Sequence, residues 1–115
     1  MKVLLFDDNL FWSARLQKTL YAMGHECEVL AAAPDVDRGA EIALVNLSQK
    51  SPAPEDLLPA LKGLGLYVVG YAGHKETELR EMGAKAGCDR IASNGEMTFK
   101  LGKILEQAAK RRNSA

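Results

Sequence analysis

Two adjacent aspartates, Asp7 and Asp8, directly follow an apolar run near the start of the chain. The run, residues 3–6, is typical of a strand that is buried on both faces of a parallel sheet. In open α/β folds, the carboxyl ends of such strands form the edge at which ligands bind. The two carboxylates therefore predict a site at this edge. A structural alternative is that Asp8 or Asn9 only caps the helix that follows.

The other side chains that could do chemistry are isolated in the sequence. Cys27 and Cys88 lie far apart and form no CxxC motif, so we expect buried thiols and neither a disulfide nor a metal site. His25 and His74 have no nucleophile paired with them in the sequence. We therefore expect no enzymatic activity, and an enzyme with a histidine base is the weakest hypothesis.

Length and composition indicate one domain, residues 1–115. The chain has 115 residues, 47% of them hydrophobic, which is enough for one core. Fifteen basic and fifteen acidic residues give a formal net charge of zero, which argues against binding to nucleic acid or to an anionic membrane. There is no signal-peptide pattern, and no apolar run approaches the roughly 20 residues of a membrane span. We expect a cytoplasmic domain.

Strand and helix patterns alternate along the whole chain. Strands are expected at residues 2–6, 26–32, 42–46, 66–71 and 88–92. Helices are expected at residues 9–24, from about Asp56, at 75–83, and from the capping box at Ser93 onward. Only residues 34–39 separate the second strand from the third, which allows no more than about a turn and a half of helix. The pattern predicts an α/β fold with a parallel sheet that is covered on both faces, with the second helix short or missing.

In this order, the segments resemble the receiver domain of bacterial response regulators, the CheY-like family of two-component signalling. The resemblance covers nearly the whole chain. It rests on the buried strand before Asp7 and Asp8, the helix that ends at Gly24, the third strand that ends at Asn46, and residues 84–89, which lead into the fifth strand. It implies a flavodoxin-like (βα)5 three-layer sandwich with a five-stranded parallel sheet of order 2-1-3-4-5.

The family's phosphoryl-binding residues carry over only in part. In the family, the acidic pair binds Mg²⁺, an aspartate after the third strand accepts the phosphoryl group, and a Thr or Ser and a lysine contact it. Asp7 and Asp8 match the acidic pair, but Asn46 stands where the acceptor is expected. Ala72 is matched to the Thr or Ser position and Ser93, or Asn94, to the lysine position.

The resemblance therefore implies a degenerate pseudo-receiver. An amide has no anionic oxygen that could attack phosphorus, so the covalent step is lost. We expect no required cofactor and only weak Mg²⁺ binding at Asp7 and Asp8, because an amide at residue 46 removes one charge from the site. We interpret the two aspartates as functional remnants, because two carboxylates without partners beside an amide would make a poor core.

Three hypotheses about function remain open. The first is a signalling module that acts through protein contacts without phosphorylation, with a bacterial signalling protein or a second copy as its partner. The second is a receiver in a phosphorelay that is phosphorylated at another residue, such as Ser48. The third is a small flavodoxin-like ligand-binding domain, although no GxGxxG motif follows the first strand and two acids there would repel phosphates.

The final helix suggests where a partner binds. Its apolar stripe contains Met97, Leu101 and Ile104, and Phe99 points away from that stripe, so we expect Phe99 to be exposed. Arg90 stands where the family has a switch aromatic, and the face that includes both residues is the one that receivers use for partners. Phe11, which lies off the stripe of the first helix, is the second candidate.

Overall fold

The computed structural model describes residues 1–36 and 38–113. Within these residues the elements are β1 (Lys2–Phe6), α1 (Leu10–Ala22), β2 (Glu26–Val29), β3 (Ile42–Asn46), α2 (Pro54–Gly63), β4 (Tyr67–Ala72), α3 (Thr77–Lys85), β5 (Arg90–Ser93), α4 (Asn94–Phe99) and α5 (Leu101–Asn113). The strands form one parallel sheet in the order β2-β1-β3-β4-β5, as the sequence predicts. No helix of the described ranges is long and apolar enough to cross a membrane.

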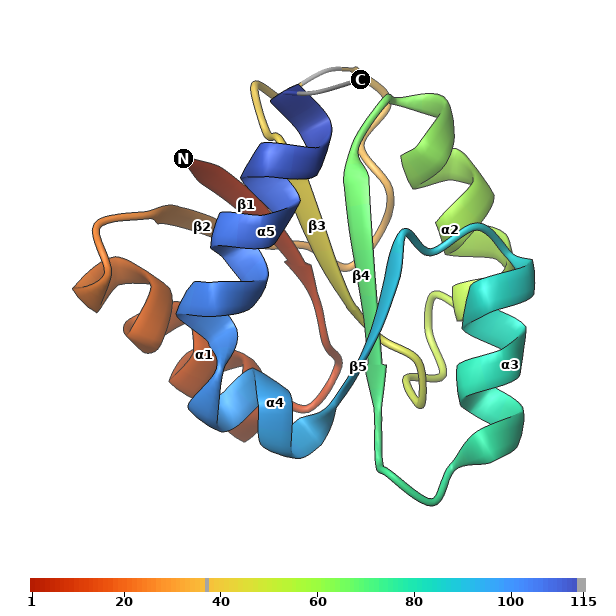
Figure 1. Cartoon of the computed structure of the whole chain (residues 1–115). Helices are drawn as coiled ribbons and strands as arrows, with labels where there is room; N and C mark the ends of the chain where they lie inside the picture. The colour runs from red at the N-terminus through yellow and green to blue at the C-terminus, as the bar shows by residue number, and fades with distance from the viewer. Residues whose placement is uncertain (37, 114–115) are drawn as a thin grey trace.

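The helices cover the two faces of the sheet. Figure 1 shows α1, α4 and α5 on one side and α2 and α3 on the other. Side chains alternate along β1, so that Val3 and Leu5 pack under α1 and α5, while Leu4 and Phe6 pack under α2. All four are buried, which confirms that the first apolar run is a strand covered on both faces.

The connection from β2 to β3 contains no helix in the part that the structure describes. Leu30 and Ala33 from this connection pack against the core on the α2 side. Arg38 forms an ion pair with Glu28, and Lys2 Nζ donates a hydrogen bond to the Arg38 carbonyl at 2.8 Å. These contacts fix the short connection in place of a second crossover helix, so the prediction of a short or missing helix is confirmed.

The predicted start of α2 was wrong by two residues. The helix begins at Pro54 and includes Pro59 in its interior. Proline at the first helical position has a favourable φ and lacks only an N–H that would have no partner there. Pro54 therefore begins the helix before Asp56. The predicted bounds of β1 and β3 agree with the structure, and the other predicted boundaries differ from it by at most three residues.

The final helix is two helices. The capping box is confirmed, because Ser93 Oγ accepts from the Glu96 amide at 3.1 Å and Glu96 Oε1 accepts from the Ser93 amide at 3.0 Å. Helix α4 ends after six residues, at Phe99. The next residue, Lys100, has a φ of −128° and a ψ of 19°, which are not helical. Leu101 then begins α5. The prediction of one continuous helix is thus wrong, but Met97, Leu101 and Ile104 all reach the same core.

Candidate functional site

The polar site lies at the carboxyl ends of three adjacent strands. Asp7 directly follows β1, Asn46 ends β3, and Tyr71 belongs to β4, where it is the register partner of Asn46. Since the strands are parallel, these ends meet at one edge of the sheet. The structure therefore brings Asp7 and Asn46 together, as the sequence predicts, and adds Tyr71 to them.

Asp7 is a buried carboxylate with protein donors on both oxygens. It is 3% exposed. Its Oδ1 accepts from Asn46 Nδ2 at 3.1 Å and from the Asn9 amide at 3.0 Å. Its Oδ2 accepts from the Tyr71 hydroxyl at 2.6 Å. Asp7 thus has three partners, and the expectation of a carboxylate without partners is wrong for it.

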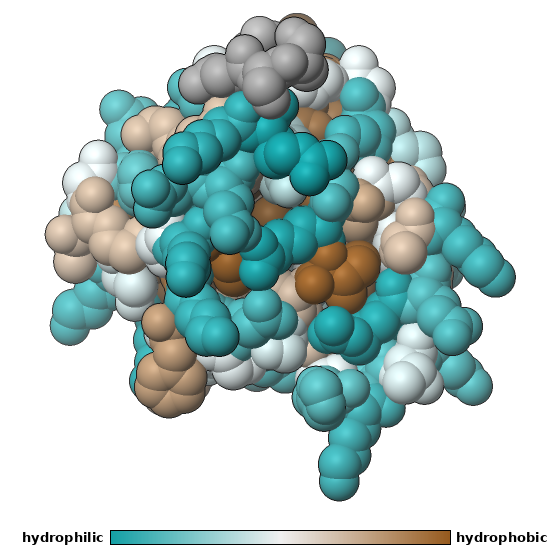
Figure 2. Space-filling view, viewed as in Figure 1, coloured by the Kyte–Doolittle hydropathy of each residue, from teal (hydrophilic) through white to brown (hydrophobic). Residues whose placement is uncertain are grey.

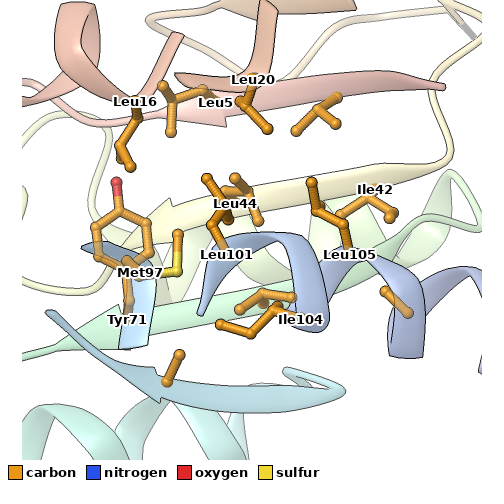
Figure 3. Close-up of a cluster of buried hydrophobic side chains, with 14 of the residues drawn as sticks. Leu5, Leu16, Leu20, Ile42, Leu44, Tyr71, Met97, Leu101, Ile104 and Leu105 are labelled. Atoms are coloured by element: carbon orange, nitrogen blue, oxygen red, sulfur yellow. The ribbon is translucent and has the colours of Figure 1, made fainter. Parts of the chain in front are cut away.

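Tyr71 is the residue that completes this network. Its side chain is fully buried among apolar residues, and Figure 3 shows it beside Met97 with the hydroxyl pointing toward Leu16. Burial, and then the charge of Asp7, raise the pKa of Tyr71 well above its ordinary value. The hydroxyl therefore keeps its proton and remains a donor to Asp7 at physiological pH.

The amide of Asn46 is held in one orientation from both sides. Its Nδ2 donates to Asp7, and its Oδ1 accepts from the Ser48 amide at 2.9 Å and from Ser48 Oγ at 2.7 Å. A carboxylate at this position could not donate to Asp7. It would also place a second negative charge against the first. The amide therefore suits the network as it stands.

The side chains of Asp8 and Asn9 form hydrogen bonds outside the network around Asp7. Asp8 is exposed, and its Oδ2 accepts from the Lys50 amide at 3.0 Å. Asn9 is the N-cap of α1, where its Oδ1 accepts from the Trp12 amide at 3.0 Å. The capping alternative therefore holds for Asn9, while Asp8 instead holds the loop after β3.

Ala72 and Ser93 do not join this network. Ala72 packs in the core on the α2 side, the face of the sheet opposite to Tyr71. Ser93 is the register partner of Ala72, and its hydroxyl is used in the cap of α4. Among the described residues, neither side chain forms a hydrogen bond with Asn46.

The residues at this edge do not fit a hard divalent cation. Mg²⁺ requires oxygen ligands in near-octahedral geometry, supplied mainly by carboxylates and water. Both oxygens of Asp7 already accept hydrogen bonds from the protein, Asp8 is bound to the Lys50 amide, and Asn46 directs its NH₂ group inward. Within the described residues there is no group of three or more acidic, histidine or cysteine side chains that could hold a metal.

A pocket of about 370 Å³ lies above the network. Its walls come from the start of α1, the end of β3 and the loop after it, and the start of α4. The lining residues are Asn9, Phe11, Trp12, Asn46, Ser48 and Asn94. None of these described residues carries a charge. Phe11 and the neighbouring Leu10 are 78% and 80% exposed.

The two residues predicted for partner binding lie apart from this pocket. Arg90, at the start of β5, donates to Gln107 and pairs with Glu96 at 3.1 Å. Phe99, at the end of α4, is 85% exposed. Figure 2 shows mostly hydrophilic surface over α5.

Sequence reasoning missed Tyr71 and Asn94. A tyrosine within an apolar strand needs a partner for its hydroxyl, and this was the available signal for Tyr71. Asn94 was considered only as an alternative match for a lysine. Its place in the pocket depends on the position of α4, which the sequence pattern does not determine.

Known structures share this arrangement of strands over nearly the whole chain. The CheY-like response regulator receiver domain protein from Methanospirillum hungatei JF-1 has 20% identity and a TM-score of 0.79, with 99% of this chain and 98% of that chain covered. The receiver domain of NtrX from Brucella abortus has 21% identity and a TM-score of 0.79, with 94% and 98% covered. This chain has the receiver fold.

A third structure supports the same conclusion at still lower identity. A two-component response regulator from Clostridium difficile has 12% identity and a TM-score of 0.81, with 98% of each chain covered. No protein-family model and no curated protein sequence matches the chain. The likeness therefore lies in the receiver fold and not in closely similar sequence.

Proposed function

We propose that this chain is a cytoplasmic receiver-like module of a bacterial two-component system that acts through protein contacts without phosphorylation. The observation that carries the proposal is the amide of Asn46, which ends β3 and is bound to both Asp7 and Ser48. We infer that Asn46 stands at the position of the receiver phosphoacceptor. An amide cannot form the acyl phosphate, so this position offers no acceptor.

The surroundings of Asn46 support the same proposal. A phosphoryl group bound there would need donors and positive charge. The Tyr71 hydroxyl instead donates to Asp7, the Ser93 hydroxyl belongs to the cap of α4, and no lysine occurs between Ala86 and Phe99. Mg²⁺ should bind weakly at most, because Asp7 has no free oxygen to offer.

The contacts of Ser48 do not favour phosphorylation at that residue. Its hydroxyl donates to the amide oxygen of Asn46, which is a poor base. A serine nucleophile needs a neighbouring general base to take its proton. We therefore keep phosphorylation at Ser48 as the alternative that the experiment below can detect.

The proposed partner surface includes Arg90 and Phe99. Exposed aromatic side chains and arginines are enriched in the residues that dominate binding energy at protein interfaces. Phe99 is available in the structure, while the guanidinium of Arg90 is held by Gln107 and Glu96. We therefore expect Phe99 to be the anchor and Arg90 to shape the surface beside it.

Treatment with a small phosphodonor and Mg²⁺, followed by intact-mass measurement, tests the proposal. We expect no gain of a phosphoryl group, while a receiver that carries the acceptor aspartate gains one under the same conditions. A stoichiometric gain on this chain would overturn the proposal. An adduct that survives acid would lie on a serine such as Ser48, because acyl phosphates hydrolyse in acid.

A further inference from the structure

We propose that the exposed side of α5 binds an acidic, extended segment of a partner protein. The binding residues are Lys103, Gln107 and Lys110, called the basic row below, together with the pocket beside Lys110. The proposal rests on the proposed function, because it takes contact with another protein as given and adds the charge of the segment that binds.

Positive charge is concentrated in the last segment of a chain that is neutral as a whole. Residues 100–115 contain five basic side chains and one acidic side chain, whereas the complete chain has fifteen of each. The members of the basic row follow one another at spacings of four and three, so they lie along one side of the helix. All three are exposed, and the surface over α5 is mostly hydrophilic (Figure 2). A partner that approaches this side therefore meets positive charge.

The helix dipole does not explain the position of Lys103. The amino end of a helix carries partial positive charge, which favours acidic side chains there and disfavours cations. Lys103 lies in the first turn of α5, which contains no acidic residue, and Lys100 directly precedes that turn. Lys110 lies in the last turn, where the dipole favours it. A cation placed against the dipole is the kind of local cost that is expected at a functional site.

The charges of the basic row are not used within the described part of the chain. The ion pairs among the described residues include neither Lys103 nor Lys110. Glu106 is the one acidic residue of α5, and it forms none of these pairs either. The two lysines can therefore pair with acidic groups of another protein without breaking an internal ion pair.

A pocket of about 650 Å³ continues the basic row at the carboxyl end of α5. Its lining includes three cationic side chains, Arg90, Lys110 and Arg111, and one carboxylate, Asp89. That carboxylate is already paired with Lys62 at 2.6 Å. An acidic side chain that enters the pocket thus meets an excess of positive charge, and the carboxylate that would repel it is neutralised by its own partner.

The length of the basic row favours a protein segment over a small anion. Seven residues separate Lys103 from Lys110, which is about 10 Å along the helix axis. One phosphate or carboxylate could pair with both only if the two like charges were drawn together. Two acidic side chains of one segment can pair with them separately.

The acidic neighbours of the basic row favour a protein over a nucleic acid. Glu106 is exposed and directly precedes Gln107, and Glu96 lies beside Arg90 at 3.1 Å. The closely spaced phosphates of a nucleic acid would meet these carboxylates as well as the lysines. A protein segment can instead place its acidic side chains only where the cations are.

Selection from a phage-displayed library of random peptides tests the proposal, with the full chain immobilised at low ionic strength. We expect the recovered peptides to be rich in Asp and Glu and to bind more weakly as salt is added. Added to ¹⁵N-labelled protein as synthetic peptides, they should shift the backbone amide signals of Lys103, Gln107 and Lys110. Neutral or basic peptides, recovery of no peptide, or shifts confined to other surfaces would overturn the proposal.

Exposed lysines on two helices provide matched variants. The double change Lys103→Gln and Lys110→Gln should weaken binding of the acidic peptides about tenfold, because it removes both cations of the basic row. Lys85→Gln is the control, since Lys85 is also an exposed lysine in the last turn of a helix but lies on α3, on the other face of the sheet (Figure 1). It should leave binding unchanged.

Equal affinity of the double variant and the control would overturn the proposal. Circular dichroism checks that both remain folded, and the double change to arginine should keep the affinity, because the positive charge is retained. Tighter binding of random-sequence duplex DNA than of the acidic peptides would show a nucleic-acid surface, contrary to the proposal. Self-association that is lost in the double variant would show that a second copy occupies α5, which also contradicts it. None of these results changes the mass measurement with a phosphodonor, which tests the proposed function separately.

Discussion

Tyr71 determines the chemistry of the site through one hydrogen bond. Its hydroxyl lies 2.6 Å from Asp7 Oδ2, and both side chains are buried. A hydrogen bond to a charged group contributes about 1.5–3 kcal/mol, and its loss leaves that charge with fewer donors. The position that an apolar strand pattern assigns to the core therefore also supplies a hydrogen-bond donor to the buried carboxylate of Asp7.

Tyr71→Phe should lower the free energy of unfolding by about 2 kcal/mol, because it removes a donor from buried Asp7 while keeping the ring. Urea unfolding at neutral pH measures the change. Tyr67→Phe is the matched control, since the Tyr67 hydroxyl has no hydrogen-bond partner within the described residues, and it should change stability little. Equal stability of Tyr71→Phe and the unmodified chain would contradict the importance of the hydrogen bond.

Asn46→Asp tests the orientation of the amide. The change replaces a donor 3.1 Å from Asp7 with a second carboxylate, so stability at neutral pH should fall by about 3 kcal/mol. Mg²⁺ should restore part of that stability and bind more tightly than in the unmodified chain, because a third carboxylate becomes available. Thermal unfolding with and without Mg²⁺ measures both effects.

The control for this variant is Asn94→Asp, which adds the same charge at an exposed position of the pocket wall. Mg²⁺ should raise the thermal stability of this variant no more than it raises that of the unmodified chain. Identical Mg²⁺ responses of the two variants would show that residue 46 does not converge with Asp7 and Asp8.

At the scale of elements, the sequence predicted the strands and a crossover helix that is short or missing, and the resemblance implied the order of the strands. An apolar run such as residues 42–45 is typical of a buried strand, and a connection as short as residues 34–39 has room for no more than about a turn and a half of helix. The break at Lys100 could not be predicted, because Met97, Leu101 and Ile104 keep helical spacing through it. Sequence reasoning also placed Asp7 and Asn46 at the site but not Tyr71, since a tyrosine fits an apolar strand without reference to β1.

The capping box of α4 gives a prediction about pH. Its Glu96 accepts from the Ser93 amide, and this bond, with a smaller contribution from Arg90, lowers the pKa of the Glu96 carboxyl. A lowered pKa in the folded state means that the charged carboxylate stabilises the fold above its unfolded pKa, and that this stabilisation is lost as the pH falls through the folded value.

Glu96→Gln keeps the shape of the capping box but removes the charge. At pH 7 it should lower stability by about 0.5 kcal/mol, a typical value for a charge at the first turn of a helix. The difference from the unmodified chain should vanish once both proteins are measured well below the ordinary glutamate pKa. A difference that persisted at low pH would show that the charge of Glu96 is not its cause.

At the scale of the whole molecule, the pocket beside Asn46 and the proposed partner surface at Phe99 lie on different elements. The pocket uses the start of α1 and the end of β3, and Phe99 lies at the end of α4. No described side chain of β5 forms a hydrogen bond with Asn46, because Ser93 is bound within its own cap. Among the described residues, no hydrogen bond joins Asn46 directly to α4 or α5.

This separation predicts that metal binding, once restored, stays local. In Asn46→Asp, Mg²⁺ with a phosphoryl mimic should shift the backbone NMR signals of Asp7, Asp8 and residue 46 and leave those of Arg90 and Phe99 in place. The protein should then bind a partner at the Phe99 surface equally well with and without Mg²⁺, since binding selects a state that is already populated. Shifts that spread from residue 46 to Phe99 would show that the two surfaces are coupled, and a matching change in partner affinity would make this fold a working switch.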